Sequence, residues 1–269
     1  FDPVDEKVYW GTMDGNSVNR SDIDGSNREV LLEDLSAAYS LHLDRQHNKL
    51  YFVQTHATEV GFAIASVNID GSEHEVHCSL PIGEIASLAV DTAGEKFYYT
   101  VDGENQVVRM NFDCTEDEIV STVNGSYAIR IDVGRDKLFV GTEHGQIISS
   151  DLDGSNAATL VNKSDVMILN MALDKDDQYL YYVQNDPNKG FDSIYRTDYV
   201  GLEDVEIYSS LANNLFALTL DTEFMPPMAD LSVTASNEVD GTTVLPAGWN
   251  WTLTVENNGF DAEFAANDV

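Results

Sequence analysis

A segment of about 44 residues recurs five times along the first 222 residues of the 269-residue chain. Each copy begins with an apolar–x–apolar–Asp segment, passes a short polar turn and enters an apolar run with aromatic residues. Clear copies are Leu41–Asp44 followed by Lys49–Phe52, and Leu88–Asp91 followed by Lys96–Tyr99. The anchor aspartates that end these segments are Asp2, Asp44, Asp91, Asp132, Asp174 and, in a sixth partial copy, Asp221. A period this regular restricts the fold to repeat architectures.

A second signature follows each aromatic run and places a polar turn between two apolar segments. Asp22–Asn27 and Asp151–Asn156 both read Asp-x-Asp-Gly-Ser-Asn. Asp-Gly between apolar segments indicates a β-hairpin, and we expect type I′ turns here. Each copy then holds about four short strands, which predicts an all-β fold, a β-propeller of four-stranded blades. The ring has five blades if Leu218–Asp221 pairs beside Lys7–Trp10, or six if a further repeat belongs to it.

The recurring residues have expected structural roles. The apolar–x–apolar–Asp segment is predicted to be the innermost strand, with the anchor Asp accepting backbone N–H bonds in the next turn. A Lys begins the second strand in four of the five copies, and we expect it to pair with the anchor Asp. Arg20, Arg109 and Arg196 recur at one register, which favours a structural role. The aromatic pairs are expected to pack between blades.

The first copy carries the most specific resemblance. It reads Val8–Thr12 and then Val18–Leu31, with an aromatic pair, an Arg and an Asp-Gly-Ser-Asn turn. This pattern resembles the YWTD propeller of low-density-lipoprotein-receptor-like proteins over about residues 1–222. The resemblance implies a propeller, normally of six blades, that is an extracellular protein-binding or spacer module without catalysis. The Thr-Asp of that family pattern is replaced by Gly11-Thr12 here, so the contacts of that pair do not carry over.

The composition changes after the repeats. Two consecutive prolines, Pro226 and Pro227, indicate a linker over residues 223–229. From residue 230, segments such as Trp251–Gly259 are similar to the start of Ig-like domains strung along bacterial and archaeal surface proteins. Such a sandwich needs about 100 residues. We therefore interpret residues 1–222 as the propeller and 230–269 as an incomplete Ig-like β-sandwich module, which another segment or chain would complete.

The charge excludes two classes of partner. The 14 Lys and Arg residues against 47 Asp and Glu give a formal net charge of −33. Nucleic-acid binding needs clustered basic residues, and an anionic membrane surface repels such a chain. We expect no nucleic-acid partner and no direct membrane insertion. Cys78 and Cys114 are the only cysteines, and they could form one disulfide or remain two buried thiols.

Two groups of residues are weak candidates for binding a metal ion. Clustered carboxylates suit calcium, and the acidic turns supply Asp22, Asp24, Asp70, Asp151 and Asp153. These turns lack the complete EF-hand spacing, so plain hairpin turns are the simpler interpretation. His74 and His77 are three residues apart, which places them on opposite faces of a strand and argues against a shared metal.

Two functions from different classes fit these features. The preferred one is a non-enzymatic extracellular or cell-surface module for protein interaction, adhesion or structural assembly within a longer secreted protein. Its partners would be other proteins, copies of itself in a filament or S-layer-like assembly, or glycans, and it would need no cofactor. The alternative is a propeller hydrolase, such as a calcium-dependent lactonase, or a lyase, with carboxylates around the central channel, for which the anchor aspartates are the first candidates if they line it. Their recurrence in every copy argues against catalysis, because catalytic residues usually break a repeat.

Overall fold

The computed structural model describes residues 1–2, 4–12, 16–55, 61–80, 83–209, 215, 218–219, 231–237 and 251–257. By its contacts the chain divides into two compact units, Phe1–Thr222 and Glu223–Val269. Asp221 and the linker assigned to residues 223–229 lie outside the described residues. No helix in the described part of the chain is long and apolar enough to cross a membrane.

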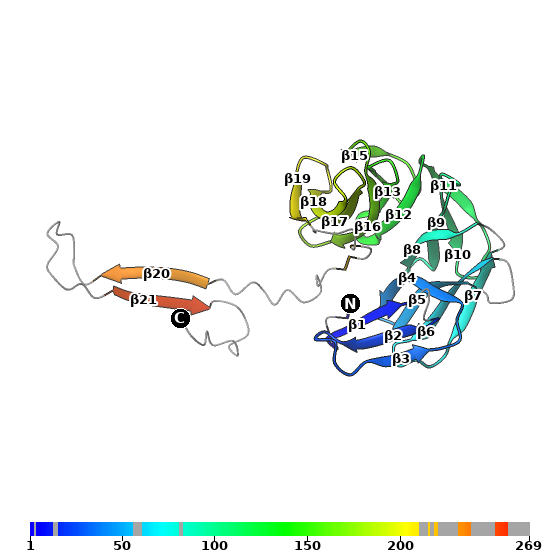
Figure 1. The fold of residues 1–269 in the computed structure, drawn as a ribbon, viewed down its shortest axis with the longest axis horizontal. Coiled ribbons are helices and arrows are strands. Elements are labelled where there is room, and N and C mark those ends of the chain that lie inside the picture. The colour runs from blue at the N-terminus through cyan, green and yellow to red at the C-terminus, as the bar shows by residue number, and fades with distance from the viewer. Residues whose placement is uncertain are drawn as a thin grey trace. The chain divides into compact units, whose positions relative to one another are not determined.

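The first unit consists of five antiparallel sheets arranged as blades around one axis (Figure 1). Blade 1 contains β1 (Lys7–Gly11), β2 (Val18–Asp22) and β3 (Glu29–Leu32). Blade 2 contains β4 (Ala37–Asp44), β5 (Lys49–Thr55), β6 (Phe62–Asn68) and β7 (Glu75–Leu80). Blade 3 contains β8 (Ile85–Asp91), β9 (Lys96–Val101), β10 (Gln106–Asn111) and β11 (Glu118–Thr122). The predicted all-β propeller is confirmed.

The remaining blades repeat this order from the axis outwards. Blade 4 contains β12 (Ser126–Asp132), the short 3-10 helix η1 (Val133–Arg135), β13 (Lys137–Thr142), β14 (Gln146–Ser150) and β15 (Ala158–Asn162). Blade 5 contains β16 (Met167–Asp174), β17 (Tyr179–Asp186), β18 (Phe191–Asp198) and β19 (Asp204–Ser209). The apolar–x–apolar–Asp segments are the innermost strands β4, β8, β12 and β16, as predicted.

The anchor aspartates close the turn after the innermost strand. Their carboxylates accept backbone N–H bonds two or three residues further on: Asp2 from Val4 (3.1 Å), Asp44 from His47 (3.1 Å), Asp91 from Gly94 (2.8 Å) and Asp174 from Asp177 (3.1 Å). Asp132 instead forms an ion pair with Arg135 at 3.2 Å. Their recurrence therefore has a local cause, the conformation of one turn.

Two details of the repeat were predicted wrongly. The Lys that begins the second strand pairs with the first residue of the acidic turn and not with the anchor Asp, because antiparallel pairing sets Lys7 directly opposite Asp22. The acidic turns are also not type I′. The loop has three residues, the Gly25 N–H donates to the Asp22 carbonyl at 2.9 Å, and Gly25 has a positive φ of 82° whereas Asp24 does not. This is a type I turn closed by a left-handed residue.

Apolar side chains fill the seams between successive blades. Successive residues of a strand point to opposite faces, so Phe52 packs towards blade 1 while Tyr51 packs towards blade 3. Clusters of this kind join blades 1 and 2, 2 and 3, 3 and 4, and 4 and 5. The prediction that the aromatic pairs pack between blades is confirmed.

Among the described residues, the arc of blades is open between its two ends. The strands nearest the axis lie side by side from β1 to β4, β8, β12 and β16, whereas no comparable contact joins described strands of blade 5 to blade 1. Figure 1 shows this opening between β16–β19 and β1–β3. Leu218 and Thr219 line the central cavity but are not in a strand. Leu220 and Asp221 lie outside the described residues, so closure into five blades by Leu218–Asp221 stays one of the two alternatives, beside a ring of six.

The second unit is described only in part. Strands β20 (Leu231–Asn237) and β21 (Trp251–Asn257) pair antiparallel over their whole length. An Ig-like module over residues 230–269 stays a prediction, since the other residues of that segment lie outside the described part.

Candidate functional site

Successive blades meet through one repeated backbone contact, in which the acidic turn of a blade packs on the outer strand of the preceding blade. A Cβ built on Gly71, Gly154 or Gly201 would lie 3.0, 1.5 or 2.6 Å from a carbonyl oxygen of that strand, belonging to Leu31, Val120 and Leu160 respectively. Glycine permits this approach because it has no side chain. We call this contact the seam contact.

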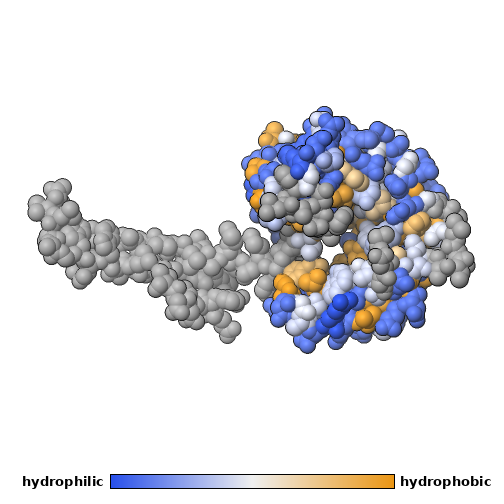
Figure 2. Space-filling view, in the orientation of Figure 1, coloured by the Kyte–Doolittle hydropathy of each residue, from blue (hydrophilic) through white to orange (hydrophobic). Residues whose placement is uncertain are grey.

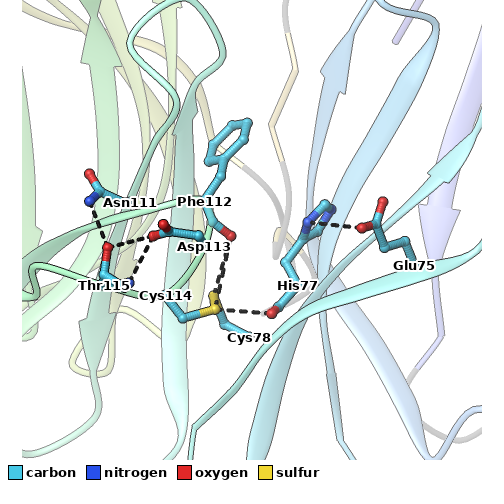
Figure 3. Close-up of a disulfide and its surroundings, with 8 residues drawn as sticks. All are labelled: Glu75, His77, Cys78, Asn111, Phe112, Asp113, Cys114 and Thr115. Carbon is cyan, nitrogen blue, oxygen red and sulfur yellow. Dashed lines mark hydrogen bonds and ion pairs between the residues drawn. A yellow bond between two sulfur atoms is a disulfide. The ribbon is translucent and has the colours of Figure 1, made fainter.

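The seam between blades 2 and 3 replaces the glycine with a disulfide. Cys114 occupies the glycine register of the turn and is bonded to Cys78 on β7, 36 positions earlier in the sequence. Its Sγ lies 3.0 Å from the His77 carbonyl oxygen, the counterpart of the carbonyls met by the glycines (Figure 3). The covalent link thus joins the same two elements that touch at the other seams.

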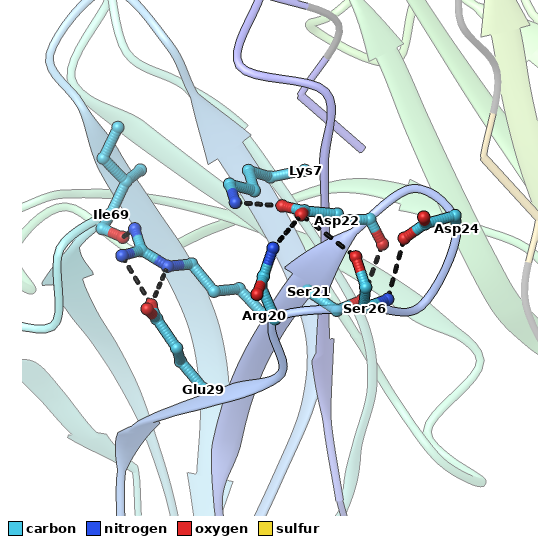
Figure 4. A network of polar contacts seen from close by, with 9 residues as sticks. Lys7, Arg20, Ser21, Asp22, Asp24, Ser26, Glu29 and Ile69 are labelled. Carbon is cyan, nitrogen blue, oxygen red and sulfur yellow. Dashed lines mark hydrogen bonds and ion pairs between the residues drawn. The ribbon is translucent and has the colours of Figure 1, made fainter.

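Arginines of the recurring register donate hydrogen bonds across the seam to the next blade. Arg20 Nη1 donates to the carbonyl of Ile69 in the turn of the next blade at 2.7 Å, and its Nε donates to Glu29 at 2.7 Å (Figure 4). Arg109 likewise reaches the carbonyl of Leu152 at 3.4 Å. The structural role predicted for this register therefore has a definite form, a link from one blade to the next.

The two ends of the arc carry the unmatched halves of this contact. At blade 1 a Cβ on Gly25 would meet nothing within 4 Å, and the adjacent Ile23 is 61% exposed. The counterparts of Ile23 in blades 2 to 5 are all packed against a seam cluster; they are Ile69, Phe112, Leu152 and Tyr199.

Blade 5 exposes the other half of the seam contact, its outer strand β19. Every residue of β19 is exposed, and Ile207, at the register of Leu31 and Leu160, is 52% exposed. Arg196 reaches no carbonyl of another blade among the described residues; it lies over the Tyr179 ring at 4.2 Å, and its buried Nε has no hydrogen-bond partner. An unsatisfied buried donor is costly and unusual. We call Ile23 with Gly25, and Arg196 with β19, the two end faces.

The acidic turns hold their carboxylates in local hydrogen bonds. The proposed calcium ligands are spread over three blades, with Asp22 and Asp24 in blade 1, Asp70 in blade 2, and Asp151 and Asp153 in blade 4. Lys137 donates to Asp151 at 2.6 Å, and the backbone N–H of Ser155 donates to Asp153 at 2.8 Å. Side-chain hydrogen bonds of this kind lower the pKa of all five carboxyl groups.

These turns do not bring their carboxylates together with those of other blades. In the described part of the chain, no three His, Cys, Asp or Glu side chains are grouped so that they could hold a metal ion. His74 and His77 face different partners, the side chains of Gln54 at 3.0 Å and Ser66 at 2.8 Å. Burial lowers the pKa of both imidazoles. Calcium binding by the turns stays a prediction.

A cavity of about 1040 Å³ occupies the axis of the arc and is lined from all five blades. Its surface is mixed, with leucines beside serine, tyrosine and charged side chains. Arg130 on β12 and Lys175 after β16 lie in its lining, as do Glu84, Asp102 and Glu143. Asp2, Asp44, Asp91, Asp132 and Asp174 are not part of this lining, so the carboxylates at the cavity are Glu84, Asp102 and Glu143 and not these anchor aspartates.

Arg130 was missed as a candidate, although the sequence contains a signal for it. It is the variable residue of the apolar–x–apolar–Asp segment, a position occupied by His42, Ala89 and Ala172 in the neighbouring copies. A charged residue that breaks a repeat at the innermost strand is the pattern expected of a functional position.

Together the fold and the seam contact define the class of the first unit as a β-propeller of four-stranded blades. No protein-family model matches the chain. Solved structures with a similar fold include a nidogen–laminin complex, with TM-score 0.58 and 12% identity over 77% of this chain and 93% of that one. TolB from Acinetobacter baumannii has TM-score 0.62 and 12% identity over 78% of this chain, which spans 53% of TolB.

Similar folds also include an enzyme. A gluconolactonase from Xanthomonas campestris has TM-score 0.55 and 15% identity over 67% of this chain and 66% of its own. At such identities the likeness concerns the fold alone, and it includes both protein-binding and catalytic propellers. Function has to be argued from the residues of this chain.

Proposed function

We propose that residues 1–222 form a non-enzymatic interaction module of an extracellular or cell-surface protein, and that the module binds its protein partner at the two end faces. The observation that carries this proposal is the pair of unmatched half-contacts, the exposed Ile23 beside Gly25 and the exposed β19 beside Arg196. Exposed apolar residues of this kind, next to a buried donor without a partner, favour an interface.

The occupant that these faces fit is one further β-sheet blade of the same repeat. The seam contact occurs four times within the chain, each time between an acidic turn and the outer strand of the preceding blade. Each end face presents one of these two elements, so a blade of the same repeat would supply the partner of each. A blade placed in the opening would cover Ile207 with its turn and offer Arg196 a carbonyl group. Its outer strand would cover Ile23 and Gly25. Binding by addition of β-structure to an exposed edge is a common mode of recognition.

Three further observations support an extracellular interaction module. The Cys78–Cys114 disulfide suits an oxidising compartment. The similar fold in the nidogen–laminin complex belongs to a protein that binds another protein. The anchor aspartates, which the lactonase or lyase alternative would use, are occupied in the turns they close.

Binding of a labelled blade polypeptide tests this proposal. The probe is residues 126–162 of this chain, the complete blade 4, and it is titrated against the whole chain by fluorescence anisotropy. The probe need not be folded when free, because ordering can accompany binding. We expect saturable one-to-one binding that Arg196→Ala or Ile207→Asp weakens about tenfold or more, a loss of roughly 1.4 kcal/mol.

The matched control is Ile119→Asp, which places the same charge on an exposed isoleucine of β11, away from both end faces. This variant should bind the probe like the original chain. Absence of saturable binding, or equal weakening by Ile119→Asp and Ile207→Asp, would contradict the proposal.

A further inference from the structure

The axial cavity is lined by Arg130, a cation that no carboxylate neutralises among the described residues. Figure 2 shows the molecule hollowed near its axis, where the cavity of about 1040 Å³ lies. Arg130 Nη1 donates to its own neighbour, the Ile129 carbonyl, at 2.6 Å, and Nη2 donates to Asn170 Oδ1 at 2.8 Å. Both acceptors are neutral. In the part of the chain that the structure describes, no carboxylate pairs with this guanidinium.

The missing partner is notable in a chain with 47 acidic residues and 14 basic ones. Most other basic side chains of this chain have ion-pair partners, as Lys137 has in Asp151 and Arg135 in Asp132. A charge removed from water without a counter-ion is destabilising. Burial accordingly lowers the pKa of Arg130 to about 10. An anion in the cavity would remove that penalty.

Two serine hydroxyls in the lining of the cavity that holds Arg130 can also donate hydrogen bonds. The Ser87 hydroxyl accepts the Ile129 N–H at 3.2 Å, and the Ser40 hydroxyl accepts the Leu88 N–H at 2.8 Å. Both serines line the cavity. A hydroxyl that accepts from the backbone retains its own proton for donation. Such donors beside a guanidinium suit an anionic group.

Positive charge is concentrated at one end of the cavity. Lys175 and Arg130 both lower the pKa of His42, after burial, and bring it to about 4. Glu84, Asp102 and Glu143 belong to the opposite end, where the innermost strands begin, as the pairings of β8 with β9 and β12 with β13 show. An anion is therefore favoured near Arg130 and repelled at the other end.

We propose that Arg130 binds the carboxylate of a small organic acid in the axial cavity. A guanidinium binds a carboxylate through two parallel hydrogen bonds, and Lys175 adds a second positive charge to the lining of the same cavity. The organic part would lie against Leu43, Leu88 and Leu173, which line the same cavity. A cavity of this volume accommodates a ligand of drug size. This site is independent of the end faces and of the proposed function.

Titration with hexanoate, and with the neutral hexanamide as its matched analogue, tests the site by calorimetry. We expect hexanoate to bind the chain at least about tenfold more tightly than hexanamide, and Arg130→Gln to remove that preference. Arg135→Gln is the control, since it makes the same change in net charge at an arginine already paired with Asp132. It should leave the preference unchanged.

A spectroscopic readout avoids dependence on the folding of the variant. In the original chain, the side-chain Nε–H resonance that disappears in Arg130→Lys should shift on addition of hexanoate and not of hexanamide. Equal affinities for acid and amide, the same hexanoate affinity in Arg130→Gln, or an unshifted Arg130 resonance would overturn the proposal.

Discussion

At the scale of single residues, one arginine register shows how position in the arc changes the role of a side chain. Arg20 and Arg109 tie their blades to a carbonyl of the next blade, whereas Arg196 has no such acceptor among the described residues. The three residues occupy the same register and differ mainly in whether a following blade supplies a carbonyl acceptor.

Removal of these arginines should therefore have unequal effects on stability. Arg20→Ala should lower the free energy of unfolding by about 1.5–3 kcal/mol, the usual range for a hydrogen bond from a charged group. Arg196→Ala should lower it by about 1 kcal/mol or less, since Arg196 stacks on Tyr179 and pairs with the exposed Glu203 at 3.5 Å. Urea unfolding of both variants measures the difference. Equal losses in the free energy of unfolding would show that the hydrogen bond from Arg20 to the Ile69 carbonyl does not stabilise the fold.

His42 should make stability depend on pH. Burial, followed by the charges of Lys175 and Arg130 and opposed by Asp44, lowers its pKa from 6.5 to about 4. The unfolded chain then takes up a proton on this residue before the folded chain does. Stability from this residue is complete above pH 6.5 and is lost as the pH falls towards 4, by up to about 3 kcal/mol.

The variant His42→Gln isolates this contribution. Its free energy of unfolding should fall less between pH 6.5 and pH 4 than that of the original chain, in urea titrations at each pH. The same slope in both proteins would show that His42 is not held neutral by the fold.

The sequence predicts the roles of residues with nearby partners better than the roles of residues whose partners lie on another blade. Asp44 and Asp91 were predictable as turn residues because their role depends on the next few residues. The acceptor for Arg20 lies 49 residues away on another blade, which no local pattern specifies. Arg130 could be flagged as a break in the repeat, but its lack of a counter-ion depends on five blades meeting at the axis.

At the scale of elements, the seam contact is a backbone-to-backbone approach that glycine permits at three seams and that a disulfide replaces at the fourth. The strands and their order follow from period-2 alternation and were predictable, as were the turn positions from Asp-Gly. The turn type was not, because Asp-Gly occurs both in two-residue loops and in three-residue loops with a left-handed glycine. The turn at Gly25 has the same φ of 82° as that at Gly154, although no atom lies within 4 Å of a Cβ built on Gly25, so packing on a preceding blade does not set the turn type.

Alanine substitutions at matched glycines measure this packing. Gly154 and Gly25 both have φ of 82°, but only Gly154 faces a carbonyl oxygen, at 1.5 Å from a built Cβ. Gly25→Ala should cost about 1–2 kcal/mol for the left-handed conformation alone. Gly154→Ala should cost at least about 1–3 kcal/mol more, because the strand must move away. Urea unfolding gives both values, and equal costs would mean that Gly25 is also covered.

At the scale of the whole molecule, the net charge of −33 has a partial structural explanation. Asp22, Asp70 and Asp151 are turn residues repeated from blade to blade, and the anchor aspartates belong to the architecture in the same way. The unusual feature is therefore Arg130 at the axis, which has no carboxylate partner among the described residues, rather than the acidic surface. The arc combines an internal cavity with two end faces that carry complementary halves of one contact.

Disulfide trapping across the opening tests most directly whether the two end faces stay apart within one chain, as binding of a partner between them requires. Cys114 and Cys78 occupy the registers of Gly25 and Tyr208, so Gly25→Cys with Tyr208→Cys recreates the blade 2–3 pair at the two ends. The variant is oxidised as a monomer, and its thiols are mapped by peptide mass spectrometry. We predict that Cys78–Cys114 forms while the two introduced thiols stay free. An intramolecular disulfide between positions 25 and 208 would contradict this account, because it would show that blade 5 closes directly onto blade 1.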